Sequence, residues 1–371
     1  MAIATAADTI ERVRRKGITR VVRTVLVAVV VVAVFAYAVP KFADYGSAWA
    51  VVKMLSWAQV VLLVAATAVN AVSYWSQLVA SLPGLTLGQA AVNNQTATSM
   101  ANTVPGGGVL AIGVACLMLR SWGFSSGSVA LSVVLTGVWN AFLRLALPIL
   151  AVAVLAVSGT ATGALLLPAL IGLAALTTAA ALAGLVLCKN TLARRIGGRL
   201  GAAVSWLRRL VHKPPVTGWA DAALRFRHQS TDLVGRRWLA LTITTAVSHL
   251  SLYLVFLLTI RAVGIGGAEV SSAEVLGIFA LGRLLTAAPI TPGGVGVVEL
   301  TYIAGLVLAG GDQIRVQAVA AALLFRLLTY GLQIPLGGIT YLIWQRKTSW
   351  RGPFQEQEPA PRLPSAATLA A

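Results

Sequence analysis

Residues 279–312 read FALGRLLTAAPITPGGVGVVELTYIAGLVLAGGD, and this stretch decides the architecture that we expect for the chain. It is apolar enough for a membrane, but Pro292, Gly293 and Gly294 interrupt it near its middle. A helix that crosses a bilayer needs about 20 consecutive, mostly apolar residues. The stretch therefore predicts a broken helix, and its surroundings must show how it lies in the membrane.

A second apolar stretch, residues 88–119, is broken in the same way by PGGG at Pro105 to Gly108. In chain order, the first break (PGGG) interrupts residues 88–119, and the second (TPGGVG) interrupts the apolar stretch 272–309. Other apolar segments are uninterrupted and long enough to cross a membrane. These candidate spans are residues 22–39, 57–79, 127–157, 163–187, 237–260 and 316–343.

The composition excludes a water-soluble fold. Of the 371 residues, 58% are hydrophobic and only 11% are charged, whereas a soluble domain carries about a quarter charged residues. Lys and Arg number 29 against 11 Asp and Glu, for a net charge of +18. On a soluble protein this excess indicates nucleic acid, but on an apolar chain it marks cytoplasmic regions. We therefore expect an all-α integral membrane protein that does not bind nucleic acid.

The basic residues set the expected topology. Six lie in residues 1–23, eleven in residues 188–238 and four in the tail from residue 346. The positive-inside rule places these three regions in the cytoplasm, with the chain in the inner or plasma membrane. The loop 188–238 then lies inside only if residues 88–119 enter and leave on one side. By the same logic residues 272–309 return to the outer side, which predicts six spans and two re-entrant hairpins.

The start of the chain has a second interpretation. Basic residues, an apolar run from Thr24 and AYA at residues 36–38 are also typical of a cleaved signal peptide. We favour a retained first span, because residues 24–40 contain no charge and the following spans need an orientation.

The two hairpins have similar surroundings. A long span precedes each, and a span with an arginine inside it follows each, Arg144 in the first case and Arg326 in the second. With the expected topology this arrangement is an inverted repeat, which is a recurrent plan of transporters. The alternative is that Pro and Gly only kink two ordinary spans, since membrane helices tolerate both.

Few ionisable residues lie inside apolar stretches, and such residues are often functional. The candidates for substrate binding are Arg144, Arg283, Glu299 and Arg326. Arg283 and Glu299 fall at similar distances from Pro292, so we expect a pair, either a structural ion pair or one that an anionic headgroup displaces. Guanidinium binds phosphate in a bidentate manner, so Arg144 and Arg326 are candidates for a lipid phosphate, with snorkelling to the surface as the alternative.

The turn residues have a structural explanation, because glycine permits tight turns and close backbone approach. Thr291 is a candidate helix cap. The expected re-entrant turns consist of Pro105, Gly106, Gly107, Gly108, Thr291, Pro292, Gly293, Gly294 and Gly296. Two cysteines and three histidines without ligand spacing predict no metal site, and without a phosphate-loop motif we expect no nucleotide or other cofactor.

Uncharged polar residues in or near the spans are expected to form interhelical hydrogen bonds rather than a ligand site. They are Asn93, Asn94, Gln95, Asn140, His249 and Gln333. The loop 188–238 mixes basic and apolar residues, which is typical of an amphipathic helix on the anionic inner leaflet.

Residues 279–312 resemble the signature of the flippase-like membrane domain of lysylphosphatidylglycerol synthases. NTVPGGGV at residues 102–109, with LRSWGF at 119–124, resembles a divergent first motif of that family. The resemblance covers about residues 20–345 and implies a helical domain that moves a lipid between leaflets. In two-part relatives the cargo is an aminoacylated phosphatidylglycerol, but this chain has apolar residues at 109–112 where relatives commonly have polar ones.

The resemblance also implies how the chain is divided. We expect a basic cytoplasmic segment at 1–21, the flippase-like domain at 22–345 with its basic loop 188–236, and a disordered tail at 346–371. The tail is too short and polar for a synthase domain, so we do not expect an enzyme. The expected function is movement of an anionic or modified phospholipid, or of a lipid-linked precursor. The alternative is an accessory or scaffold protein that assists a separate synthase or glycosyltransferase.

Overall fold

The computed structural model describes most of the membrane-embedded part of the chain. The described residues are 45–103, 107–157, 219–286 (side chains from residue 230) and 294–352, with isolated positions at 174, 177–178, 198–199, 201–202 and 205–206. All regular structure in these residues is helical. The expected span 22–39 lies outside the described residues, and so does 163–187 except for three helical positions.

Four helical stretches are long and apolar enough to cross a membrane. They are α3 (Trp57–Ser81), α6 (Ser126–Val157), the part Ser230–Ala262 of α9, and Asp312–Arg346, which contains α12 (Arg315–Arg326) and α13 (Gln333–Arg346). Each overlaps one of the expected uninterrupted spans, so four of those six are confirmed as long apolar helices.

The helix α9 (Trp219–Ala262) begins earlier than expected. Residues 219–236, which we placed in the basic loop with its expected amphipathic helix, are helical but continue directly into the membrane span. The last prolines before the helix are Pro214 and Pro215, and the Ala, Leu and Arg residues that follow have high helix propensity. The charged residues therefore extend a helix that the hydrophobic pattern alone starts at residue 237.

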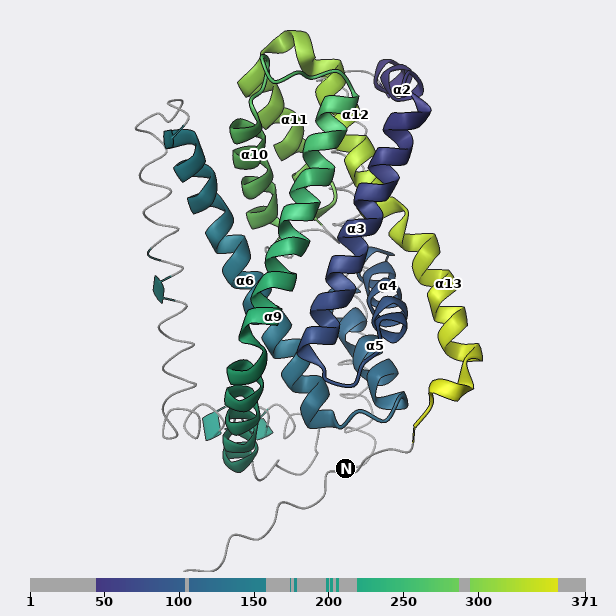
Figure 1. Cartoon of the computed structure of the whole chain (residues 1–371), viewed down its shortest axis with the longest axis vertical. Helices are drawn as coiled ribbons and strands as arrows, with labels where there is room; N and C mark the ends of the chain where they lie inside the picture. Colours follow the sequence, from purple (N-terminus) through teal and green to yellow (C-terminus); the bar gives the residue numbers. More distant parts are fainter. Residues whose placement is uncertain are drawn as a thin grey trace, which may run out of the picture.

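Both Pro-Gly sequences separate two short helices that pack against each other. The first pair is α4 (Leu87–Thr103) and α5 (Gly107–Ser121), and the second is α10 (Ser272–Leu285) and α11 (Val297–Gly310). The chain thus reverses at each break and does not continue as a kinked span (Figure 1). With 14 to 17 residues, each helix is about 21 to 26 Å long, less than the roughly 30 Å of a bilayer core.

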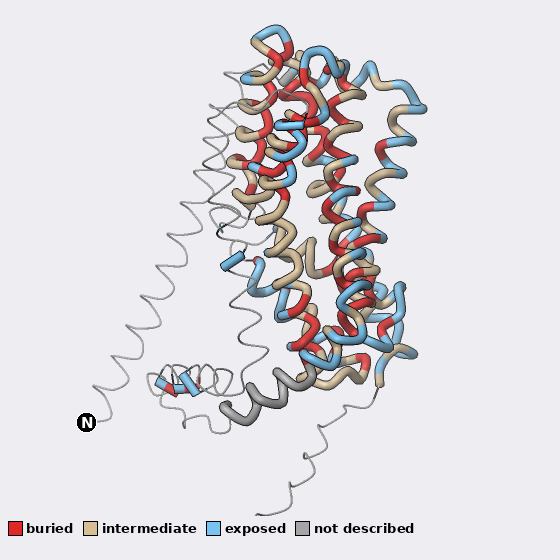
Figure 2. The backbone as a smooth tube through the Cα atoms, turned by 60° about the vertical axis from the view of Figure 1, so that its left-hand side comes forward, coloured by how far each residue is buried: buried red, intermediate tan, exposed pale blue. Residues whose placement is uncertain are grey.

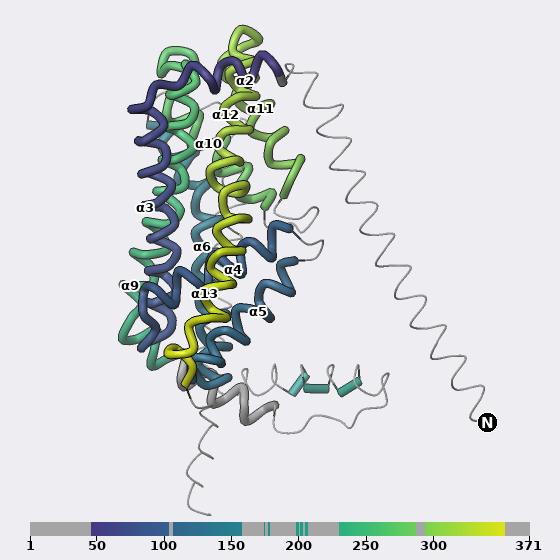
Figure 3. Tube along the Cα trace, turned by 90° about the vertical axis from the view of Figure 1, so that its right-hand side faces the viewer, coloured from purple at the N-terminus to yellow at the C-terminus, as the bar shows by residue number. Residues whose placement is uncertain are grey.

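The two hairpins lie toward opposite ends of the bundle, as both side views show (Figures 1 and 3). Helices α3 and α9 pack along each other, α13 packs along α4, and α6 packs along α10. Each hairpin is therefore covered by a long helix that follows the other hairpin in sequence. Buried and exposed residues alternate along the helices, because each helix turns one side toward its neighbours (Figure 2).

The segment after α13 folds back onto the end of the first hairpin. The Gly352 N–H donates to the Ser121 carbonyl at 3.2 Å, and the Trp350 ring meets the Trp122 ring edge-on at 5.7 Å. Our expected disordered tail, which started at residue 346, is therefore wrong for residues 346–352, because the Trp350 ring is partly buried against the hairpin. The remaining residues, 353–371, lie outside the described part.

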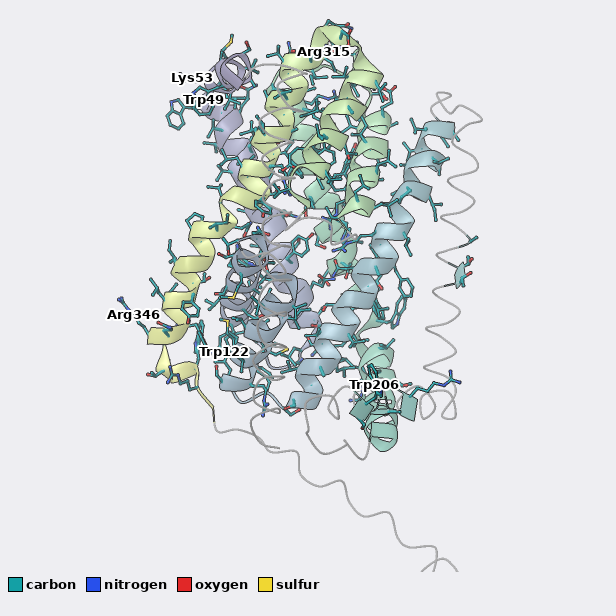
Figure 4. All side chains as sticks on the ribbon, turned by 180° about the vertical axis from the view of Figure 1, so that it is seen from behind. Trp49, Lys53, Trp122, Trp206, Arg315 and Arg346 are labelled. Atoms are coloured by element: carbon teal, nitrogen blue, oxygen red, sulfur yellow. The ribbon has the colours of Figure 1, made fainter. Side chains whose placement is uncertain are left out.

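Aromatic and basic residues mark both ends of the bundle. The short helix α2 (Tyr45–Lys53) lies across one end, where Trp49, Lys53 and Arg315 are found (Figures 3 and 4). Trp122 and Arg346 lie at the other end (Figure 4). This distribution is typical of residues at the two interfaces of a membrane.

Candidate functional site between the two hairpins

The second Pro-Gly sequence ends in a tight turn that places a carboxylate at the start of α11. Gly294 and Gly296 have φ angles of +72° and +90°, which side-chain-bearing residues rarely adopt. The Gly296 N–H then donates to Glu299 Oε2 at 2.7 Å, so the Glu299 carboxylate caps its own helix. Glu299 therefore lies in the first turn of α11, close to the hairpin turn.

The other oxygen of this carboxylate binds an arginine from the following helix. Arg326 Nε donates to Glu299 Oε1 at 2.7 Å, and the two side chains are only 14% and 2% exposed. A charge buried in this way requires a partner, because desolvation costs several kcal/mol per ion. Arg326 thus points into the bundle and does not snorkel to a membrane surface.

The expected pair between Arg283 and Glu299 is wrong. Our estimate counted helical rise from Pro292, but residues 294–296 form a turn and α11 begins only at Val297. Glu299 consequently faces α12, while Arg283 in the last turn of α10 forms no ion pair with a described carboxylate.

The ion pair continues toward the first hairpin. The Arg326 guanidinium stacks on the Tyr330 ring at 4.3 Å, and the Tyr330 hydroxyl donates to the Asn102 carbonyl at 2.6 Å. Asn102 lies in the last turn of α4, next to the first Pro-Gly sequence. Tyr330 belongs to a π-helical turn, η6 (Leu327–Gly331), and such turns are frequent at functional sites. One series of contacts therefore joins the two hairpins.

A cavity of about 220 Å³ lies between the hairpins. Arg283 and Arg326 line it from the second half of the chain, while Tyr74, Asn94 and Thr98 line it from the first half. Glu299 does not line this cavity, but it forms the ion pair with Arg326, which does.

A second cavity, of about 430 Å³, continues from the first toward α5 and α6. Arg144 lines it, and Tyr74, Asn94 and Thr98 line both cavities. We call the two adjoining cavities the arginine chamber. Three of the four predicted binding residues line this chamber, and the fourth pairs with one of them.

Several buried polar atoms of the chamber have no hydrogen-bond partner in the described part of the chain. They are Arg144 Nε, Arg283 Nε and Gln95 Oε1. Arg144 and Arg283 are also close enough to interact electrostatically. Buried polar groups are normally satisfied, so an unpaired donor and an unpaired acceptor in one cavity suit a ligand.

The uncharged polar residues form interhelical hydrogen bonds, line the chamber, or do both. Asn93 Nδ2 donates to the Ala115 carbonyl at 2.9 Å and so joins α4 to α5, which confirms an interhelical bond. Asn140 Nδ2 likewise donates to Gln77 Oε1 of α3 at 3.3 Å, a second interhelical bond. Asn93, Asn94, Gln95, Asn140 and Gln333 all line the chamber as well, which the sequence did not indicate. His249 is fully buried and its Nδ1 lies 3.1 Å from the Thr245 carbonyl, away from the lining.

Sequence reasoning missed Tyr74, Thr98, Asn102 and Tyr330. A single tyrosine or threonine in an apolar helix carries no signal, and the π-helical turn has no sequence signature. Of the predicted turn residues, Gly107 and Gly108 begin α5, and Gly294 and Gly296 shape the second turn. Pro105, Gly106, Thr291, Pro292 and Gly293 lie outside the described residues.

A family model described as the lysylphosphatidylglycerol synthase TM region matches residues 25–337 of the chain. The matched range includes both hairpins and every residue of the arginine chamber. No curated protein matches the sequence.

Proposed function

The chain belongs to the family of lysylphosphatidylglycerol synthase transmembrane regions, and from this we propose that it moves an anionic lipid between the leaflets of the cell membrane. The matched region is the membrane part of those synthases and not their catalytic part. The cargo is a phospholipid or a lipid-linked precursor with a phosphate in its headgroup. This sequence has no phosphate-loop motif, so the proposed transport has no nucleotide-driven step within it.

The observation that carries this proposal is the arginine chamber deep in the bundle. Arg283 is eleven residues after Ser272, and Arg326 is eleven residues after Arg315, which places both about 17 Å from the same end. Arg144 is thirteen residues before Val157, about 20 Å from that end. Charges near the middle of a membrane are costly and mark the pathway of a charged substrate.

The proposed membrane arrangement is six spans and two re-entrant hairpins in an inverted repeat. Three features support it: short hairpin helices, their location at opposite ends, and the packing of α13 on α4 and of α6 on α10. The irregular turns then face the protein interior, where non-helical backbone is tolerated. The end of the bundle with Arg346 is cytoplasmic in this proposal.

In the proposed mechanism the phosphate oxygens accept hydrogen bonds from Arg144 and Arg283, and the acyl chains stay in the lipid. Small movements of the hairpins open the chamber first to one leaflet and then to the other. Because Glu299, Arg326, Tyr330 and Asn102 connect the hairpins, the two movements are coupled.

The test is leaflet-resolved labelling of a fluorescent phosphatidylglycerol in proteoliposomes. Wild type should accelerate its movement, and R144A and R283A should each slow it by roughly tenfold, about the 1.4 kcal/mol of one lost charged hydrogen bond. The matched control is R315A, because Arg315 is exposed at the end of the bundle and pairs with Asp312.

A wild type that accelerates no phosphate-bearing lipid would contradict the translocase. The accessory role would then be favoured, in which the protein assists a separate lipid- or glycan-modifying enzyme. A rate unchanged in both R144A and R283A would remove the chamber from the mechanism.

A further inference from the structure

The charge on the lining of the arginine chamber is of one sign only. Its described lining residues include Arg144, Arg283 and Arg326 but no Asp or Glu. The charge of Arg326 is balanced by Glu299, which lies outside the lining with its Oε1 2.7 Å from Arg326 Nε. Among the described residues, Arg144 and Arg283 therefore have no carboxylate beside them, and the chamber is suited to negative charge.

The first hairpin explains why Arg144 has no carboxylate partner in the part of the chain that the structure describes. Glu299 is the seventh residue after Pro292, and the seventh residue after Pro105 is Ile112. Ile112 and Arg144 line the same cavity. An ion pair in one half of the chain is thus replaced by an isoleucine and an uncompensated arginine in the other half.

The rest of the polar lining consists of uncharged groups that both donate and accept hydrogen bonds. Tyr74, Gln77, Asn94, Thr98 and Asn140 line the larger cavity. Carboxamides and hydroxyls of this kind are suited to the hydroxyl groups of a glycerol or a sugar, which also donate and accept.

The side-chain oxygen of Gln95 also favours a headgroup with hydroxyl groups. Gln95 is only 6% exposed, it lines the smaller cavity, and its Oε1 has no hydrogen-bond partner in the described part of the chain. A ligand that carries an O–H or N–H group can donate to this acceptor, which a phosphate diester alone cannot do. An ammonium group can donate, but it would enter a cavity whose uncompensated charges are positive, and like charges repel strongly at low polarity.

We propose that the chamber selects an anionic lipid whose headgroup beyond the phosphate carries hydroxyl groups and no positive charge. The phosphate binds Arg144 and Arg283, and a headgroup hydroxyl donates to Gln95 Oε1. An aminoacylated phosphatidylglycerol is excluded, because its ammonium groups find no carboxylate among the described lining residues. This selectivity rests on the proposed translocase and specifies its cargo.

The first experiment compares headgroups in one proteoliposome assay. The probes are fluorescent phosphatidylglycerol, its lysyl ester, phosphatidylethanolamine and a polyprenyl-phosphate sugar. We expect phosphatidylglycerol or the phosphosugar to move at least roughly tenfold faster than the lysyl ester, about 1.4 kcal/mol of discrimination. The faster of the two identifies the source of the hydroxyl-bearing headgroup. A lysyl ester that moves as fast as both would overturn the selectivity and leave the translocase intact.

Binding to the purified protein separates the two proposals. Native mass spectrometry in detergent reports retention of phosphatidylglycerol against its lysyl ester without any transport. Preferential retention of phosphatidylglycerol with no movement of any lipid supports the chamber assignment and contradicts the translocase. Equal retention of the two lipids overturns the assignment.

The sharpest variant is I112E, which adds a carboxylate to the cavity of Arg144. It should lower the rate for phosphatidylglycerol, raise that for the lysyl ester and shift their ratio by roughly tenfold. The matched control I112Q has nearly the same size and no charge, so its ratio should remain that of wild type. If I112E does not fold, N94D places a carboxylate in the chamber from α4 and should shift the same ratio in the same direction. An unchanged ratio in a folded I112E or N94D protein contradicts the proposal.

Discussion

Glu299 and Arg326 form the most buried ion pair described, and their pairing differs from the one that we expected. The sequence correctly indicated which ionisable residues lie inside the membrane domain, because charges in apolar stretches are conspicuous. It could not indicate the partner of Glu299, because that depends on where α11 begins after the turn at Gly294 and Gly296. Which charges meet is decided by a few residues of turn geometry.

This pair predicts a large effect of E299Q on stability. Glutamine keeps the hydrogen bond to the Gly296 N–H but removes the carboxylate charge that pairs with Arg326, which costs about 3 to 5 kcal/mol for a buried pair. Thermal unfolding of the purified protein in detergent measures the change as a clearly lowered midpoint.

The control for E299Q is E274Q. Glu274 occupies the same position in α10, where its Oε2 accepts from the Ser271 N–H at 2.8 Å, but no arginine of the described ranges binds it. The cost of E274Q should be that of a weakened cap, about 1 kcal/mol or less. Equal losses in the two variants would show that the Arg326 contact contributes nothing to stability.

At the scale of the elements, α4 and α13 are joined by close backbone approach and by hydroxyl groups. The Thr96 and Thr340 hydroxyls lie 3.0 Å apart, and the Ser99 hydroxyl donates to the Ile334 carbonyl at 3.1 Å. A Cβ at Gly337 would overlap the Ser99 side chain. Small residues and interhelical hydroxyl bonds are how helices associate in lipid.

The neighbouring glycines Gly337 and Gly338 provide a matched test of this packing. A Cβ at Gly338 meets no atom within 4 Å, whereas one at Gly337 forces α4 and α13 apart. We expect G337A to destabilise the protein by about 1 to 3 kcal/mol through overpacking, and G338A to leave it unchanged or slightly more stable. Thermal unfolding of both variants measures the difference, and a G337A protein as stable as G338A would contradict the close approach.

The elements themselves were largely predictable. Hydrophobic runs located the four long helices, and Pro with consecutive Gly predicted the two breaks. The continuity of α9 from Trp219 into the membrane span and the ordered segment to Gly352 were missed, because tertiary packing and helix propensity extend both beyond the hydrophobic pattern. The π-helical turn at residues 327–331 was not predictable, since no residue type requires it.

At the scale of the whole molecule, the arrangement predicts which chain segments share a side of the membrane. The ends of the first hairpin, Leu87 and Ser126, should lie on the side of Arg346. The ends of the second hairpin, Ala268 and Gln313, should lie on the opposite side. Single cysteines at these five positions, in a chain without its two native cysteines, report the side through an impermeant thiol reagent.

A hairpin that crossed the membrane fully would give a different result. Its two ends would then be labelled from opposite sides, and the inverted repeat would be wrong. The cysteine in place of Arg346 defines the reference side, which we propose to be cytoplasmic, and a cytoplasmic residue reacts only after the membrane is opened.

The packing of α13 on α4 also bears on how the protein is made. Asn102 and its partner Tyr330 are 228 residues apart, so the ribosome synthesises α13 long after α4 has left it. During that interval the hydroxyl groups of Thr96 and Ser99 face the insertion machinery or lipid without the helix that later binds them. The first hairpin is therefore completed last, and a chain shortened before α13 would offer quality-control proteases an exposed polar surface inside the membrane.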